Sequence, residues 1–335
     1  MLTRRAMLAV MGGALQAGLV MGGARAAEQS IRLSILQFGT AAWELAAMAA
    51  LGFDAAHGLV LETRRAANND AGRLAFLAGA VDGVVSDLLW AARLKVEGRD
   101  LVYLPFSAAE GAVMVPAGSA LKGLPDLTGV RLGVAGGPLD KSWLLLQAEA
   151  RRSAGLDLAR SARLSFGAPP LLAAKLEQGE LDAALLYWTF GARLEAKGFR
   201  RLVTMDAVLA ALGITPPPAL VGYVFHGAFA RQRPAVLAAF AAASRETKAA
   251  LAGAGPAAEK GWAAARAVMA AGDEATFEAL RRGFIAGIPR QPVAAEAAAA
   301  TRLVSVLAAQ GGSELIGPLR ALPDDFYWPR GDGAL

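Results

Sequence analysis

The sequence predicts an α/β protein of two lobes, each a mostly parallel sheet flanked by helices, and three observations support this fold class. Short apolar strands alternate with helices between residues 31 and 106, which is typical of a parallel sheet. The same alternation starts again at residue 130 and continues to 204. The stretch 77–82 is echoed at 177–182, each time as a helix end, a glycine and a turn aspartate before a buried strand. Two half-chains built on one plan indicate two facing lobes, although reuse of a common connection would give the same echo.

The first half of the chain contains strands, helices and the residues that end them. Thr40 and the run 68–70 precede helices, where their side chains can accept hydrogen bonds from free N–H groups. Gly52 and Gly79 follow helices and can adopt the left-handed conformation that ends them. The predicted strands are 31–38, 59–63, 83–86 and 101–106, and the predicted helices are 41–51, 71–78 and 88–97.

The second half centres on a strand, a glycine turn and a helix start. The strand 130–135 leads through Gly136, Gly137 and a proline into the helix 142–154. The proline suits the first helical turn, and the glycines let backbone N–H groups approach a ligand. Ligands of open α/β sheets bind at such strand ends, although an ordinary strand-to-helix turn has the same sequence. A nucleotide P-loop is excluded, because the two positions before Lys141 that must be glycine are Ala135 and Asp140.

The remaining elements continue the alternation and then give way to helices. From residue 234 the chain is alanine-rich, with charges spaced as on exposed helix faces, and we expect these helices to cover the first lobe. The further strands are predicted at 163–166, 183–187, 201–204 and 220–225, and the further helices at 170–178 and 190–196.

The first 26 residues have the features of an export signal. Arg4 and Arg5 precede an apolar run, and Ala24 and Ala26 are the small residues of a cleavage site. The paired arginines favour the twin-arginine route, with general secretion as the alternative. Five glycines dilute the run too far for a stable membrane span. Without this segment the 34 basic residues fall to 31 against 29 acidic ones, a net charge of +2, and no basic run favours nucleic-acid binding.

The residue inventory argues against several kinds of chemistry. The chain has no cysteine, which excludes disulfides, a thiol nucleophile, thiolate metal sites and a lipid-modified amino-terminal cysteine. Its two histidines, His57 and His226, lie far apart and have no metal-ligand spacing. The G-x-S-x-G turn of many serine hydrolases is also absent. The sequence therefore predicts no catalytic residue, no metal site and no cofactor.

Several short motifs together resemble the periplasmic solute-binding proteins of ABC importers, in the nitrate/sulfonate/taurine branch that also contains binders of thiamine pyrimidine precursors. The motifs are AGAVD at 78–82, GSALKGL at 118–124, DLTGVRLGV at 126–134 and GELDAA at 179–184, and the similarity covers most of residues 31–290. The resemblance implies the two-lobed type II periplasmic-binding-protein fold, in which two crossover strands join the lobes. We place the crossovers near 112–115 and 220–225. The expected organisation is an export signal at 1–26, a first lobe at 27–114 and 223–335, and a second lobe at 115–222.

In that family the ligand lies between the lobes, where loops at the strand ends contact it. Carried over to the matching positions, the resemblance implies a ligand-binding site formed by Phe38, Thr40, Trp43, Asn69, Asp70, Ser86, Asp87, Trp90, Gly136, Gly137, Asp140, Lys141, Tyr187 and Trp188. Each residue has a structural alternative. Trp43 and Trp90 also suit the core, Asn69, Asp70 and Asp87 also suit helix caps, and Lys141 also suits a solvated helix face.

The predicted site also indicates the ligand. Aromatic residues and several aspartates face the expected cleft, and Lys141 is the only obvious cation there. A sulfonate or nitrate site would be expected to place arginine or several N–H donors on the anion. Aromatic walls with carboxylates favour a neutral or cationic small organic molecule, through stacking and charge pairing.

The resemblance implies a periplasmic binding protein, not an enzyme, whose lobes close over a small molecule and present it to an ABC permease and its ATPase subunit. We expect a monomer without a nucleic-acid partner. One alternative is an enzyme like the pyrimidine synthase that shares this fold, but that enzyme depends on a cysteine motif absent here. A second alternative is the sensory domain of a transcription factor, which the export signal argues against.

Overall fold

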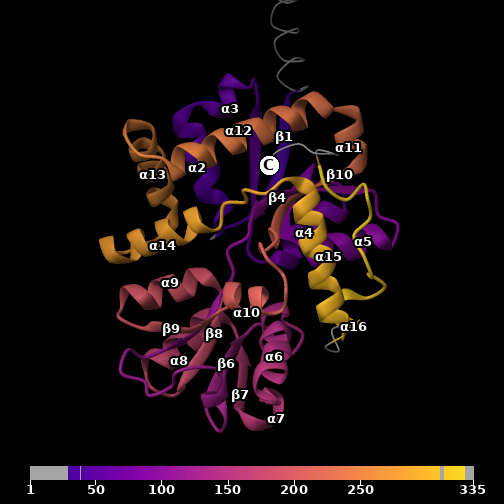
Figure 1. The fold of residues 1–335 in the computed structure, drawn as a ribbon. Helices are drawn as coiled ribbons and strands as arrows, with labels where there is room; N and C mark the ends of the chain where they lie inside the picture. The colour runs from indigo at the N-terminus through magenta and orange to yellow at the C-terminus, as the bar shows by residue number, and fades with distance from the viewer. Residues whose placement is uncertain (1–28, 38, 310–312, 329–335) are drawn as a thin grey trace, which may run out of the picture.

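The computed structural model describes residues 29–37, 39–309 and 313–328, and the chain forms two lobes, each around a five-stranded sheet (Figure 1). In lobe 1 the strand order is β2 (Val60–Ala66), β1 (Ser30–Leu36), β3 (Gly83–Asp87), β10 (Val221–His226), β4 (Leu101–Ser107). In lobe 2 the order is β7 (Arg163–Gly167), β6 (Arg131–Ala135), β8 (Ala183–Leu186), β5 (Ala112–Val115), β9 (Arg200–Thr204). The predicted two-lobed α/β fold with mostly parallel sheets is confirmed.

Each sheet contains one antiparallel strand, and that strand arrives from the other lobe. β5 pairs with β8 and β9 in lobe 2, and β10 pairs with β3 and β4 in lobe 1. The chain therefore crosses between the sheets at 108–111 and 212–220, which we call crossover one and crossover two. The boundaries expected at 114/115 and 222/223 fall inside β5 and β10. An apolar run predicts a strand, but it does not reveal which sheet the strand pairs with.

Helices flank both sheets close to the predicted positions. In lobe 1 they are α2 (Ala41–Leu51), α3 (Phe53–Ala56), α4 (Asn69–Leu77) and α5 (Leu88–Val96). In lobe 2 they are the 3₁₀ turn η1 (Leu124–Leu127), α6 (Lys141–Ala154), α7 (Leu158–Ser161), α8 (Pro169–Glu177), α9 (Trp188–Ala196) and α10 (Met205–Ala211). Helices α5, α6 and α9 begin directly at, or a short turn after, the carboxyl ends of strands, so their first turns face the space between the lobes.

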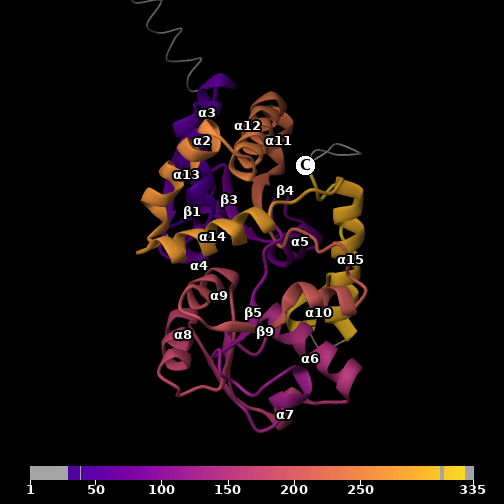
Figure 2. The same cartoon turned by 60° about the vertical axis from the view of Figure 1, so that its left-hand side comes forward.

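The carboxyl-terminal helices do more than cover lobe 1. They are α11 (Gly227–Gln232), α12 (Pro234–Ala252), α13 (Pro256–Met269), α14 (Glu274–Ala286), α15 (Val293–Ala309) and α16 (Ser313–Ile316). α12 and α13 pack against α2 as expected, but α14 contacts α9 and α15 contacts α6, so both reach lobe 2 (Figure 2). The alanine-rich pattern predicts buried faces without naming their partners. Leu303 and Val304 of α15 join one hydrophobic core that runs through both lobes.

The echo between residues 77–82 and 177–182 corresponds to equivalent turns of the two lobes. The backbone N–H and the guanidinium of Arg32 donate to the Asp82 carboxylate at 2.8 and 2.6 Å. The same groups of Arg131 donate to Asp182 at 2.9 and 2.6 Å. Both pairs join the amino ends of parallel strands. The carboxyl ends of the strands are left facing the other lobe.

Among the described residues, no helix has the length and apolar character needed to cross a bilayer. The predicted export signal, 1–26, lies outside the described residues.

Candidate functional site

A cavity of about 520 Å³ lies between the lobes, at the carboxyl ends of the strands. Its size is typical of small-molecule sites. Both lobes and crossover one contribute to its lining. The predicted site residues that line it are Thr40, Asn69, Ser86, Asp87, Trp90, Asp140, Lys141, Tyr187 and Trp188. Contact between these residues and a ligand stays a prediction.

Two aspartates of the lining are also helix caps. One oxygen of Asp87 accepts from two N–H groups in the first turn of α5, at 2.9 and 3.3 Å. Asp140 caps α6 in the same way, at 2.9 and 3.3 Å. Capping satisfies N–H groups that a helix start leaves free, and it fixes the carboxylate in the cavity wall. Thr40 and Tyr187 precede α2 and α9 without a side-chain cap, so their hydroxyls are not committed to the helix ends.

Lys141 lines the cavity and forms an ion pair that links the two lobes. Its ammonium nitrogen lies 3.6 Å from Asp87 Oδ2 of lobe 1 and 3.6 Å from Glu110 Oε1 of crossover one. Burial lowers the pKa of Lys141, but the carboxylates of Glu110, Asp87 and Asp140 outweigh it, so the pKa lies well above the ordinary value. The Lys141 side chain is 17% exposed. It is a fixed charge of the site and not a solvated helix residue.

Burial changes the pKa values of two carboxyl groups around Lys141, those of Glu110 and Asp140. Burial raises the pKa of Glu110, and the nearby Lys141 ammonium opposes the rise. The same two causes act on the pKa of Asp140, where burial again prevails. Ser142 Oγ donates to the other Glu110 oxygen at 3.1 Å. Partial burial also raises the pKa of Tyr187 to about 12, so its hydroxyl is a neutral hydrogen-bonding group.

Arg73 forms part of the lobe 1 wall. It lies one helical turn after Asn69 on α4, and its Nε donates to Ser86 Oγ at 3.0 Å. Its guanidinium carbon sits 5.0 Å from the centroid of the Trp90 ring, in a cation–π arrangement. Burial lowers the pKa of Arg73, and the Asp87 carboxylate opposes the change. Arg93 also lines the cavity. The expectation that Lys141 is the only cation in the cleft is therefore wrong.

Trp188, on α9 of lobe 2, packs against lobe 1. Its ring meets Trp43 edge to face at a centroid distance of 5.8 Å. A Cβ atom at Gly283 of α14 would lie 2.6 Å from the Trp188 ring, so only glycine accommodates this contact. Trp43 itself is 3% exposed and packs against Phe284 in the lobe 1 core. Of the two alternatives for Trp43, the structure places it in the core, beneath the residue that lines the cavity.

Other predicted residues lie beside the cavity. The Asp70 side chain is 93% exposed and lies 3.7 Å from Arg73, and the cap of α4 is Asn68, whose Oδ1 accepts from Ala71 N–H. Gly136 and Gly137 form the turn before α6 and do not line the cavity. Gly136 has a φ of 88°, and a Cβ there would lie 3.2 Å from the Tyr187 hydroxyl, so this glycine shapes the wall from behind. Phe38 lies outside the described residues.

Several lining residues were missed in the sequence. Arg73 had a signal, because residues four apart share a helix face and Asn69 was already assigned to the site. Glu110 had a weaker one, since it stands just before the predicted crossover. The other lining residues not predicted include Leu36, Val85, Leu89, Arg93, Leu139, Thr189, Phe190, Val221 and Leu315. Within the described parts of the chain, no group of acidic or histidine side chains could hold a metal ion.

Comparison with known proteins identifies similar folds. No protein-family model matches the sequence, and no curated protein matches it. The chain is similar in structure to the periplasmic aliphatic sulphonate binding protein SsuA from Escherichia coli, with 19% identity, a TM-score of 0.67, and coverage of 87% of this chain and 94% of that one. It is also similar to an ABC transporter protein from Parabacteroides distasonis, at 15% identity, TM-score 0.64, and coverage of 90% and 100%. A third similar structure is the desulfurization enzyme DSZB, at 16% identity, TM-score 0.57, and coverage of 86% and 96%. The chain therefore has the two-lobed fold of periplasmic binding proteins, as the sequence motifs predict.

Proposed function

We propose that the chain is the extracytoplasmic solute-binding component of an ABC importer, which captures a small organic molecule between its lobes and delivers it to a permease and its ATPase subunit. The observation that carries the proposal is the inter-lobe cavity of about 520 Å³, lined by side chains from both lobes and a crossover. The fold shared with periplasmic binding proteins supports it. A molecule held by both walls stabilises the closed arrangement of the lobes, because it has differential affinity for that state.

The ligand we favour carries no net charge, either as a neutral molecule or as one with both an anionic and a cationic group. The charged side chains of the lining balance one another, with three carboxylates and three cations: Asp87, Glu110, Asp140, Arg73, Arg93 and Lys141. Trp90, Phe190 and Trp188 offer flat apolar surface for an aromatic or aliphatic body. A strongly charged ion would leave one set of these partly buried charges unmatched.

Closure brings three inter-lobe contacts together. The first is the Lys141–Asp87 ion pair, and the second is the packing of the Trp188 ring against Trp43 and Gly283. The third is a pair of hydrogen bonds from the guanidinium of Arg193. Arg193 on α9 donates to the carbonyl oxygens of Ala270 and Met269 in lobe 1, at 2.9 and 3.1 Å. The ligand then adds contacts to a surface that is already complementary. Export to the periplasm, through the twin-arginine route, and a monomeric state complete the proposal.

The test is a thermal-shift screen of sulfonates, nitrate, amines, pyrimidines and amino acids, followed by calorimetry on each hit. We expect one class of small molecule to bind with 1:1 stoichiometry. Asp87→Ala and Trp188→Ala should each weaken that binding at least about tenfold, since each removes a charge or a ring from the wall. Asp324→Ala, which changes an exposed aspartate that does not line the cavity, is the matched control.

Two results would contradict the proposal. One is unchanged affinity in both cleft variants while they remain folded. The other is tight binding restricted to a simple inorganic anion such as nitrate, which would contradict the balanced-charge ligand.

A second candidate function is catalysis, because the fold is also that of a desulfurization enzyme. Titratable groups with raised pKa values, Glu110 and Asp140, surround Lys141, and such clusters occur in active sites. Mass spectrometry of each hit after prolonged incubation distinguishes the two. A binding protein returns the molecule unchanged, whereas turnover of any hit favours the enzyme.

A further inference from the structure

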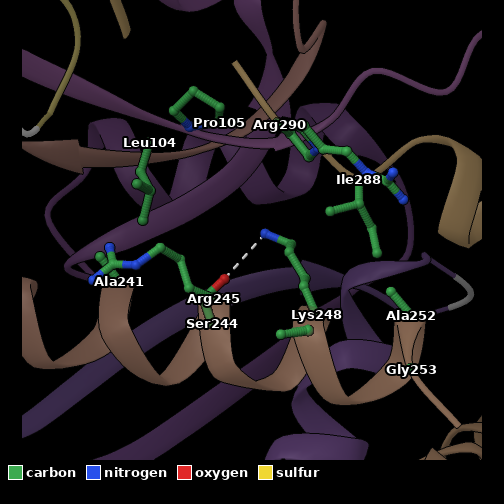
Figure 3. Close-up of a pocket in the computed structure, with 12 residues that line it drawn as sticks. Leu104, Pro105, Ala241, Ser244, Arg245, Lys248, Ala252, Gly253, Ile288 and Arg290 are labelled. Carbon is green, nitrogen blue, oxygen red and sulfur yellow. Dashed lines mark hydrogen bonds between the residues drawn. The ribbon is translucent and has the colours of Figure 1, made fainter. Parts of the chain in front are cut away.

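A second cavity lies in lobe 1, outside the inter-lobe cleft (Figure 3). It encloses about 590 Å³, within the range of small-molecule pockets. Helix α12 forms one wall, the middle of strand β4 forms another, and the segment 288–290 after α14 forms the third. Among the described residues, the two cavities share no lining residue.

Three cationic side chains line this cavity. Arg245 and Lys248 come from α12, and Arg290 comes from the segment after α14. No acidic residue of the described chain lines it, and neither arginine forms an ion pair with a described carboxylate. The cavity is therefore positively charged, and an anion is the ligand that such a surface attracts.

Lys248 adds a buried donor to this surface. Its side chain is 9% exposed, and its ammonium lies 3.0 Å from Ser244 Oγ and 3.4 Å from Glu44 Oε2 (Figure 3 shows the bond to Ser244). An ammonium has three N–H donors, so one remains for a ligand. The buried Glu44 offsets one of the three positive charges. Over the described part of the chain, Arg245 and Arg290 are left without a counter-charge.

The rest of the wall is apolar. Leu104 and Pro105 lie on β4, an edge strand of the lobe 1 sheet, and Pro105 has no N–H to leave unpaired there. Ile288 and Pro289 close the opposite side. This combination suits a molecule with a hydrocarbon part and an acidic group, and not a bare inorganic ion.

We propose that this cavity is a second binding site, specific for a small organic anion whose oxyanion group meets Lys248, between the flanking side chains of Arg245 and Arg290, while its hydrocarbon part lies on the β4 wall. The site lies beside crossovers one and two. Ala108 N–H of crossover one donates to Gly287 O at 2.8 Å, and Gln291 Nε2 donates to Pro217 O of crossover two at 3.0 Å. The segment that forms the cavity wall is thus tied at both ends to the segments that join the lobes.

Calorimetry and NMR titration of the full mature chain test the proposal with three probes: hexanoate, its uncharged counterpart hexanamide, and inorganic phosphate. We expect hexanoate to bind at one site and both other probes to bind at least about tenfold more weakly. Resonances of α12 and of residues 288–290 should shift with hexanoate. The double variant Arg245→Gln/Arg290→Gln should lower hexanoate affinity at least about tenfold, because both residues are exposed and their loss leaves the fold intact.

Matched variants separate binding in this cavity from binding in the inter-lobe cleft or on the general surface. Arg302→Gln removes an exposed arginine that lines neither cavity, and Asp87→Ala alters the inter-lobe cleft, so both should leave hexanoate binding unchanged. Removing Lys248 alone would leave Glu44 buried without a cation, so the lysine is tested as Glu44→Gln/Lys248→Met. The proposal is overturned by absent saturable binding of hexanoate, by equal loss in Arg302→Gln, by loss in Asp87→Ala, or by phosphate or hexanamide binding as tightly as hexanoate.

Discussion

A buried glutamate lies at each of the two segments that join the lobes. One carboxyl group has a cationic partner and the other has none among the described residues. Crossover one contains Glu110, whose side chain is 7% exposed and lies 3.6 Å from the Lys141 ammonium. Crossover two is contacted by Glu296 of α15, which is fully buried and accepts from Ala219 N–H at 2.8 Å. Within the described chain, Glu296 has no cation within ion-pair distance.

The difference shows that the partner, and not burial alone, decides what a buried carboxyl does. Burial raises the pKa of both groups, but Lys141 opposes the rise for Glu110. Burial raises the pKa of Glu296 to about 7, and only the hydrogen bond from Ala219 N–H opposes it. Crossover one therefore carries charges matched across the cleft. Crossover two is instead bound by Glu296 of α15, whose raised pKa lets its carboxyl gain or lose a proton near neutral pH.

Lys141→Met tests the charged side of this comparison and should have the largest effect. The variant leaves Glu110, Asp87 and Asp140 close together without their cation, which should destabilise the protein by about 4 kcal/mol at pH 7. The loss should shrink at pH 5, because protonation of Glu110 removes part of the repulsion. Urea denaturation at both pH values measures it.

Lys175→Met is the control for that experiment, since it removes an ion pair with Glu180 from the partly exposed surface of α8. Its cost should stay below about 1 kcal/mol. Equal destabilisation by the two variants would show that Lys141 is only another surface charge.

Glu296→Gln tests the carboxyl group at crossover two, which has no cationic partner among the described residues. The folded-state pKa of Glu296, about 7, lies above the ordinary value of 4.5, so the folded state binds the proton more tightly than the unfolded state. The stability that Glu296 contributes should therefore be fully present below pH 4.5, and about 3 kcal/mol of it should be lost as pH rises through 7. The variant keeps an oxygen for Ala219 N–H and does not titrate, so this loss should disappear.

Denaturation of both proteins between pH 4.5 and 8.5 gives the difference directly. Glu259→Gln, which replaces an exposed glutamate of α13, should follow the wild type at every pH. A wild-type curve parallel to that of Glu296→Gln would mean that Glu296 is ionised throughout.

Features of the two lobes that depend on the local sequence could be predicted. The alternation of strands and helices, with the echo at 77–82 and 177–182, was sufficient to predict two equivalent lobes, because each lobe repeats one local pattern. The aspartates at the helix starts, Asp87 and Asp140, could be assigned to the cavity edge, since Asp87 ends an apolar strand and Asp140 follows one after the turn 136–139. These features depend on neighbours in the chain.

Features that depend on distant partners could not be predicted. Charges in the alanine-rich helices suggested exposed faces, yet Glu296 and Lys248 are buried, one against crossover two and the other on Glu44. A helical pattern gives the period of burial but not the partner that arrives from 77 residues away, as the backbone N–H of Ala219 does at Glu296. The sheet that β5 and β10 join depends on distant partners in the same way, because each pairs with strands of the other half of the chain.

Tyr103→Phe should have the smallest effect and measures the neutral hydrogen bond at crossover two. The fully buried Tyr103 hydroxyl donates to Ala219 O at 2.9 Å, on the same residue that Glu296 binds through its N–H. The variant keeps the ring that stacks on Phe326, so only this bond is lost, at a cost of about 1 kcal/mol. The cost should not change between pH 5 and 8, because burial holds the pKa of Tyr103 well above 10. Tyr327→Phe is the matched control: its buried hydroxyl has no hydrogen-bond partner in the described chain, and its loss should cost nothing. A Tyr103→Phe cost near that of Lys141→Met would remove the distinction between a charged and a neutral crossover.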